Sequence, residues 1–258
     1  SSRSQLVSGA ANAVEAAGAV VGAQAQQLKP ALLALSQRIT GGQTATELEA
    51  QLLSVPSPLV RTWGQRDTLH IYDADRHWMK VVASRPQLVQ TGRRGLMPSQ
   101  ESLDAALDLF VQGGELTRRE LFPLLSDEYL AEVAERAGPG KAAQNFGAGR
   151  LIWRLAHQGH LCLTRKDKAE QYYVARAHRF PALAWPEALP EPDEAAASLA
   201  ADYLRVYGPA TVQDIGHHFG ATVTSARGWV QRLQPGLRRV TCGDRRDLLL
   251  LEEDAEAL

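Results

Sequence analysis

Two glutamines, Gln24 and Gln26, are separated by a single alanine. Residues two apart share a face in an extended segment but not in a helix. Pro30 disfavours a helix at Lys29 and Gly22 loosens the chain before the pair, so the two amides can converge if this segment is extended. An amide is neither an acid nor a base near neutral pH, but it offers two N–H donors and a carbonyl acceptor. Without further context, such a pair near a helix start is more often solvent-exposed surface.

The elements that follow contain an internal repeat. Residues 114–121 (GELTRREL) match residues 208–215 (GPATVQDI), and each stretch follows a helix with periodic apolar residues. We expect Gly114 and Gly208 to end those helices in a left-handed conformation. Two capping boxes should open the next helices: Thr117 with Glu120, and Thr211 with Asp214. Both copies continue into a third helix and two strands joined by a charged turn, which is the winged helix-turn-helix plan.

The first hundred residues contain similar parts in a looser arrangement. Residues 26–39 and 44–54 have helical patterns, and the second is expected to begin with a capping box between Thr46 and Glu49. Residues 57–73 predict a β-hairpin, and residues 74–85 predict another helix. We therefore expect a third module here. The alternative is a single all-α domain with incidental hairpins.

The fold prediction is a mainly α protein with small β-hairpins, of the α+β class, built from three tandem winged-helix modules. Its expected divisions are a first module over 1–99, a second over 100–180, a Pro-rich acidic linker over 181–194 and a third module over 195–258.

Composition sets outer limits on function. The 258 residues carry a formal net charge of -1, which gives none of the overall basic field that is usual for nucleic-acid binders. Arginine clusters could still act locally. The cysteines, Cys162 and Cys242, are far apart and form neither a disulfide framework nor a metal-binding spacing, so no metal or cofactor is expected. No apolar run is long enough to predict a membrane span, and a reducing bacterial cytoplasm or nucleoid fits.

The hairpin sequence is the most specific feature. Residues 59–70, LVRTWGQRDTLH, resemble the RTWxxRGTLHL signature of the AlkZ/YcaQ-like DNA glycosylases, and residues 150–155 (RLIWRL) and 203–211 (YLRVYGPAT) agree as well. The resemblance covers about residues 20 to 250. It implies three winged-helix modules curved around duplex DNA. It also implies excision of N7-alkylated purines in base excision repair and, in some members, unhooking of interstrand crosslinks.

The resemblance also implies site residues. Gln24 and Gln26 match the catalytic Gln-x-Gln motif, which places the chain in that branch of the family rather than the Gln-x-Asp branch. An N7-alkylated purine is already cationic and leaves without protonation, so amides that position water and stabilise an oxocarbenium-like sugar would suffice. The expected enzyme is a monomeric, monofunctional glycosylase acting on double-stranded DNA with alkylated bases. Asp67 departs from the family, which usually has glycine there, and an acid at this place is expected to repel phosphate or to alter the turn.

Five further residues are candidates for DNA binding. Arg61 and Arg66 lie on or beside the hairpin and could contact phosphate, and His70 could hydrogen-bond phosphate or orient a neighbour. Arg150 and Arg154 are one turn apart on one face of the expected third helix of the second module. The alternative for each is an ordinary structural or surface residue. Trp63 is expected to pack in a core or between modules.

Two other functions remain open at this stage. One is a non-catalytic winged-helix DNA-binding protein, either a regulator or a lesion-recognition protein. The other is a protein-interaction scaffold, which the neutral net charge permits.

Overall fold

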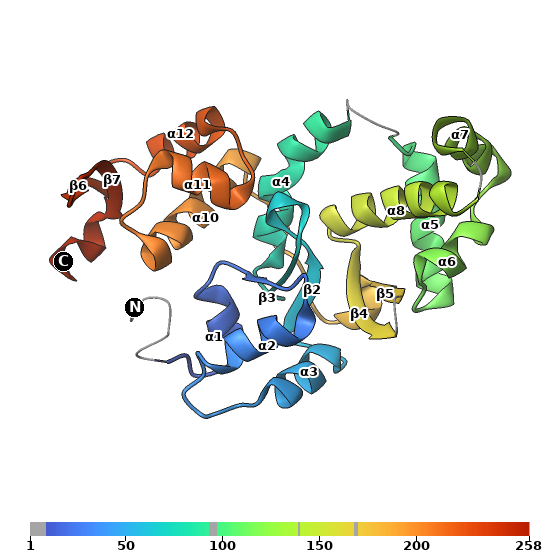
Figure 1. Ribbon diagram of the computed structural model, residues 1–258, viewed down its shortest axis with the longest axis horizontal. Helices are drawn as coiled ribbons and strands as arrows, with labels where there is room; N and C mark the ends of the chain where they lie inside the picture. The colour runs from blue at the N-terminus through green and yellow to red at the C-terminus, as the bar shows by residue number, and fades with distance from the viewer. Residues whose placement is uncertain (1–8, 93–96, 139, 168–169, 258) are drawn as a thin grey trace.

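A computed structural model of the chain describes residues 9–92, 97–138, 140–167 and 170–257. We refer to residues 9–92 as the N-terminal region, 97–180 as the middle region and 192–257 as the C-terminal region. Helices predominate and the sheets are small and antiparallel, which confirms the mixed, mainly helical prediction. Figure 1 shows the N-terminal region between the other two. No helix among the described residues is long and apolar enough to cross a membrane.

The N-terminal region contains the expected hairpin and helices. Its elements are α1 (Ala13–Gly18), β1 (Ala23–Gln24), α2 (Leu28–Ser36), α3 (Ala45–Leu53), β2 (Leu59–Trp63), the 3-10 turn η1 (Gln65–Asp67), β3 (Leu69–Asp73) and α4 (His77–Gly92). The expected capping box between Thr46 and Glu49 is wrong. Because α3 begins at Ala45, Thr44 is the N-cap, and it exchanges hydrogen bonds with Glu47.

The other two regions follow the repeat. The middle region consists of α5 (Gln100–Gly113), α6 (Arg118–Leu121), η2 (Phe122–Leu124), α7 (Asp127–Ala137), α8 (Lys141–His157), β4 (Leu161–Asp167), β5 (Glu170–Ala175) and α9 (Arg176–Arg179). The C-terminal region consists of α10 (Pro192–Tyr207), α11 (Val212–Phe219), α12 (Val223–Arg232), β6 (Leu237–Cys242), β7 (Arg245–Leu251) and η3 (Glu252–Ala257). Helix α7 is an addition that the repeat did not predict. Helix α10 begins inside the stretch that was expected to be linker.

The two repeat copies agree in detail. Both predicted capping boxes form, between Thr117 and Glu120 and between Thr211 and Asp214. In each copy the residue before the capping threonine pairs with the second strand of the hairpin: Leu116 with Tyr173, and Ala210 with Leu249. The shared capping pattern is therefore accompanied by the same junction between helix and hairpin in both copies.

The glycines that precede these junctions differ. Gly114 has the expected positive φ, 76°, but its ψ of -124° lies outside the left-handed helical conformation. Gly208 has a φ of -68° and a ψ of 157°, so its expected left-handed conformation is wrong. The physical reason is Pro209, because a residue before proline is confined to the extended region.

One sheet crosses the boundary between the N-terminal and middle regions. Its strand order is β1-β3-β2-β4-β5. The crossing point is an antiparallel pairing of Arg61 on β2 with Leu163 on β4. The expected division near residue 99 therefore separates helices but not the sheet, and the hairpin of the middle region extends the sheet of the N-terminal region.

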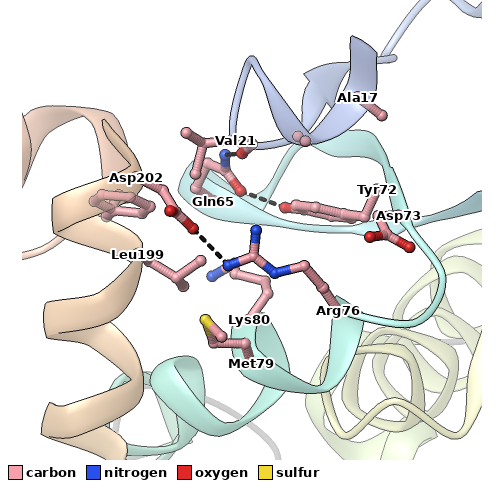
Figure 2. Close-up of a pocket in the computed structure, with 13 residues that line it drawn as sticks. Ala17, Val21, Gln65, Tyr72, Asp73, Arg76, Met79, Lys80, Leu199 and Asp202 are labelled. Carbon is pink, nitrogen blue, oxygen red and sulfur yellow. Dashed lines mark hydrogen bonds and ion pairs between the residues drawn. The ribbon is translucent and has the colours of Figure 1, made fainter. Parts of the chain in front are cut away.

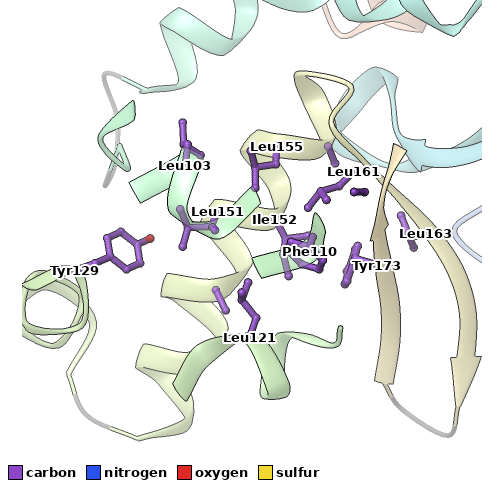
Figure 3. Close-up of a cluster of buried hydrophobic side chains, with 14 of the residues drawn as sticks. Leu103, Phe110, Leu121, Tyr129, Leu151, Ile152, Leu155, Leu161, Leu163 and Tyr173 are labelled. Atoms are coloured by element: carbon purple, nitrogen blue, oxygen red, sulfur yellow. The ribbon is translucent and has the colours of Figure 1, made fainter. Parts of the chain in front are cut away.

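Buried apolar clusters hold the regions together. The middle region has its own core, where Phe110 of α5, Leu151 and Ile152 of α8 and Tyr173 of β5 meet (Figure 3). Trp63 of β2 packs against this cluster, as predicted from its position in the hairpin. The core of the C-terminal region includes Val21 from the N-terminal region, and α10 packs along α4.

We predict that Phe110→Ala lowers the free energy of unfolding by about 3–5 kcal/mol, because it leaves a cavity in the middle core. Phe110 is 0% exposed, whereas its neighbour Val111 is 45% exposed. Val111→Ala is therefore the matched control and should change stability by less than about 0.5 kcal/mol. Denaturant unfolding of both variants checks this, and equal losses would contradict the assigned core.

Candidate active site

The glutamine pair lies in an extended segment. Ala23 and Gln24 form β1 and pair with Ile71 and His70 of β3, and the Ala25 N–H donates to the Leu69 carbonyl at 2.6 Å. Side chains alternate along the segment. The alanines at 23 and 25 are buried, whereas Gln24 and Gln26 are exposed. Gln24 ends the strand and Gln26 lies in the bend that follows, so the segment is not regular helix, which is the condition for the two amides to converge, and both are accessible to solvent.

The two amides have different surroundings. The Leu69 N–H donates to Gln26 Oε1 at 3.1 Å. Because a backbone N–H can only donate, this contact fixes which end of the amide faces β3, and the Gln26 NH2 group is left to meet a ligand. No described residue hydrogen-bonds the Gln24 side chain, so its carbonyl and its NH2 group are both free. Gln26 can therefore offer an oriented N–H donor, and Gln24 can either donate or accept a hydrogen bond.

The β2–β3 hairpin supports this segment from the buried side. Arg61 donates from Nε and Nη2 to the Ala25 carbonyl at 3.3 and 3.1 Å. Gln65 donates from Nε2 to the Val21 carbonyl at 3.0 Å, and the Tyr72 hydroxyl donates to Gln65 Oε1 (Figure 2). The residues that carry the family resemblance thus hold the backbone on either side of Gln24.

Gly22 has a different role from the one expected. It does not loosen the chain, because it is buried and has a φ of 91°. A Cβ at this position would lie 2.3 Å from the Tyr72 ring. Only glycine therefore combines this backbone conformation with this close approach to the hairpin.

Burial corrects two of the expected DNA contacts. Arg61 and His70 are each 2% exposed, so neither reaches a phosphate at the surface. Nδ1 of His70 lies 3.0 Å from the Thr68 carbonyl, which requires that this nitrogen carries the proton. Burial lowers the pKa of His70 to about 4, so the ring is neutral at physiological pH. Arg61 and His70 are internal supports of the site.

The hairpin tip presents a basic and an acidic residue. Arg66 and Asp67 are both exposed, and their φ angles are 57° and 54°. A left-handed conformation at residue 67 explains why glycine suits this place, although aspartate tolerates it. Asp67 Oδ1 lies 3.3 Å from Nε2 of the buried His157 on α8, and this contact holds the pKa of the aspartate below its usual range. The acid is therefore directed toward α8.

A cavity of about 90 Å³ lies at this tip, where all three regions meet. Arg66 and Asp67 line it together with Ser84 of α4, Trp153 and His157 of α8, and Gly220 between α11 and α12. The C-terminal region approaches closely here, since a Cβ on Gly220 would lie 3.2 Å from the Arg66 nitrogen. The tip is thus positioned by helices from the other two regions.

Arg150 and Arg154 lie on α8 and are both half-buried. The Arg150 guanidinium lies 5.6 Å from the centre of the Trp153 ring. Nε and Nη1 of Arg154 are buried without a hydrogen-bond partner among the described residues. These two Arg154 donors are therefore unpaired but covered from solvent, so an anion reaches them only if the side chain moves.

Sequence reasoning missed several buried polar residues of this site. Gln65 and Tyr72 fall inside the hairpin pattern, yet nothing in that pattern distinguishes them from surface residues. Lys80 of α4 is 7% exposed, and its burial lowers its pKa to about 8. Lys80 lies three residues after His77, so the two share one face of α4, and this spacing was the sequence signal that they are buried together. Across the described ranges, no three His, Cys, Asp or Glu residues gather as a metal site would require.

We predict that Gly22→Ala destabilises the protein by about 2 kcal/mol or more, because the new methyl group meets the Tyr72 ring at a positive φ. Gly18 has open space around an added Cβ and no positive φ, so Gly18→Ala is the control and should be close to neutral. Thermal unfolding of both variants compares them. A Gly22→Ala protein as stable as the Gly18→Ala protein would argue against the close approach.

Stability should also fall as the pH drops from about 6.5 to 4. Burial lowers the pKa of His70 to about 4 and that of His77 to about 3, whereas both titrate near 6.5 in the unfolded chain. In this window the unfolded state binds protons that the folded state excludes, at up to about 1.4 kcal/mol per pH unit for each histidine. Unfolding midpoints measured from pH 8 to 4 check this, and a flat profile below pH 6.5 would contradict it.

Comparisons with known proteins agree with these features. A family model described as "DNA glycosylase AlkZ-like" matches residues 17–258. The "Interstrand DNA cross-link repair glycosylase" of Streptomyces sahachiroi is 28% identical over 256 residues, which cover 95% of this chain and 66% of that relative, just under two thirds of its length. The solved structure of Streptomyces sahachiroi DNA glycosylase AlkZ superposes with a TM-score of 0.73 and 25% identity, covering 99% of this chain and 68% of the other. This chain belongs to the AlkZ-like DNA glycosylase family.

Proposed function

We propose that this protein is a monofunctional DNA glycosylase that excises N7-alkylated purines from duplex DNA and unhooks interstrand crosslinks formed at that position. The reaction would belong to base excision repair in the bacterial cytoplasm. The observation that carries the proposal is the arrangement of Gln24 and Gln26, which are both exposed on one extended segment held by buried residues. The name of the Streptomyces relative, which specifies crosslink repair, supports the same substrate class.

The chemistry follows from the state of the two amides. Alkylation at N7 makes the purine a cationic leaving group, so no residue has to protonate it. Water then attacks C1′ of an oxocarbenium-like sugar. The free carbonyl of Gln24 is suited to accept a hydrogen bond from this water, whose proton passes to solvent, and to face the cationic sugar with its dipole. Gln26, fixed by the Leu69 N–H, is suited to donate to an acceptor atom of the departing purine or of a phosphate. A normal, uncharged base would leave too slowly for such a weak catalytic pair, which supplies selectivity.

A frame of three tandem winged-helix modules would hold the DNA as a monomer. Several arginines from the clusters in the sequence are ion-paired with carboxylates and are poor phosphate ligands: Arg165 with Glu115, Arg238 with Glu252, and Arg239 with Asp247. Among the residues proposed for DNA binding, Arg66 is exposed, whereas Arg150 and Arg154 are half-buried and two donors of Arg154 are unpaired but covered from solvent. Arg66 is therefore the first proposed phosphate contact, and Arg150 and Arg154 are the proposed contacts from α8.

We predict that Gln24→Ala and Gln26→Ala each slow release of N7-methylguanine from duplex DNA by roughly a hundredfold, with DNA affinity nearly unchanged. Gln27 is an exposed neighbour that makes no side-chain cap, so Gln27→Ala is the matched control and should retain the parental rate. Single-turnover release of the free base measures the rates, and binding titration measures affinity. Equal rates for the parent and both variants would remove the catalytic assignment.

The same experiment separates the alternatives. Release of the base with an intact strand identifies a monofunctional glycosylase, since the abasic site then breaks only on treatment with alkali. DNA binding without base release would favour a non-catalytic binder. Binding that is undetectable, or insensitive to salt, would favour a protein-interaction scaffold, because phosphate contacts impose a steep salt dependence.

A further inference from the structure

We infer that Arg61 is a positioning residue for the glutamine pair, which it holds through the carbonyl of Ala25. The inference rests on the proposed function and deepens it, because it assigns the buried arginine of the hairpin signature to the orientation of the reacting amides. Arg61 acts through the backbone and does not touch the substrate.

The contacts of Arg61 are unusual for a buried cation. Nε and Nη2 both donate to Ala25 O, and Nη1 lies 3.4 Å from Gln171 Oε1. No carboxylate of the described residues pairs with this guanidinium. Desolvation is expensive for an unpaired charge, and an apolar side chain would fill the same space at less cost. The Ala25 carbonyl, with two N–H groups directed at it, is therefore the contact that accounts for an arginine here.

This carbonyl controls the direction of both glutamines. The Ala25 N–H is bound by the Leu69 carbonyl and the Ala25 C=O by Arg61, so both polar groups of the central residue are fixed. Rotation of either adjoining peptide would turn one glutamine away from the exposed side. The hydrogen bond from Leu69 to Gln26 adds a third restraint. Loss of Arg61 leaves the pairing with β3 but frees the peptide that joins Ala25 to Gln26.

The same side chain spans two regions. The backbone of Arg61 pairs with Ile71 on β3 and with Leu163 on β4, and its guanidinium reaches Gln171 on β5. The hairpin of the middle region thus contacts the support of the glutamine segment directly. A movement of β4 and β5 on DNA binding would therefore shift the Arg61 guanidinium and, through it, the Ala25 carbonyl.

Arg61→Leu should slow single-turnover base release at least tenfold at saturating enzyme, while DNA affinity stays within twofold of the parent. Arg61→Lys keeps one donor for Ala25 O and should recover part of the rate. Arg179 is the control, because it is also a buried arginine that donates to backbone carbonyls, those of Leu52 and Leu53 at the end of α3. Arg179→Leu should retain the parental rate in the folded protein.

A second readout does not depend on activity. Hydrogen exchange at the backbone amides of residues 23–27 should be faster in Arg61→Leu than in Arg179→Leu. Unchanged exchange and an unchanged rate in Arg61→Leu would overturn the positioning role even if Gln24→Ala is inactive. If the parent releases no base, the proposed function fails, and exchange alone decides whether Arg61 holds the segment. Should Arg61→Leu not fold, Arg61→Lys and Gln171→Ala must show smaller changes in the same direction, and parental values in both would reject the inference.

Discussion

The pairing of a two-residue strand with β3 is the interaction on which the site depends. A strand as short as β1 has too few hydrogen bonds to order itself, since fixing each residue costs conformational entropy. It is held because Arg61, Gln65 and Leu69 of the hairpin all bind its backbone or the residues beside it. The hairpin is in turn fixed by the sheet on one side and by the C-terminal region on the other. Rigid elements thus position a segment that has little regular structure of its own.

The sequence predicted the repeated parts of the fold because their signals are local. The capping boxes at Thr117 and Thr211 and the two hairpins depend on residues within a few positions of one another, and all formed as expected. The sheet that joins β2 to β4 depends on residues about a hundred positions apart, and no local pattern indicates it. Module boundaries drawn from local patterns therefore gave no indication that one sheet joins the first two regions.

The candidate site was predicted only in part, because some of its features depend on local sequence and others on contacts between distant residues. Spacing and flanking residues indicated that Gln24 and Gln26 could converge only outside a regular helix, and the structure places them there. The burial of Arg61 and His70 was not predicted, because a charged or polar residue in a hairpin is most often at the surface, whereas each of these is 2% exposed. Gly22 shows the limit clearly. In a sequence, a glycine indicates a flexible backbone. Only the position of the Tyr72 ring shows that residue 22 is glycine because there is no room for a Cβ.

Val21 has a consequence for how the protein could be divided. Its side chain belongs to the core of the C-terminal region, and the Tyr207 hydroxyl of α10 donates to the neighbouring Val20 carbonyl. A fragment ending before α10 would expose Val21 to water and release the chain just upstream of the glutamines. Shortening such a gene from its 3′ side, or exchanging its last region with that of a relative, would therefore alter the reaction centre itself. The C-terminal region thus supports the chain that leads into the site, and recombination within this family would be constrained to keep it matched to the segment around Val20 and Val21.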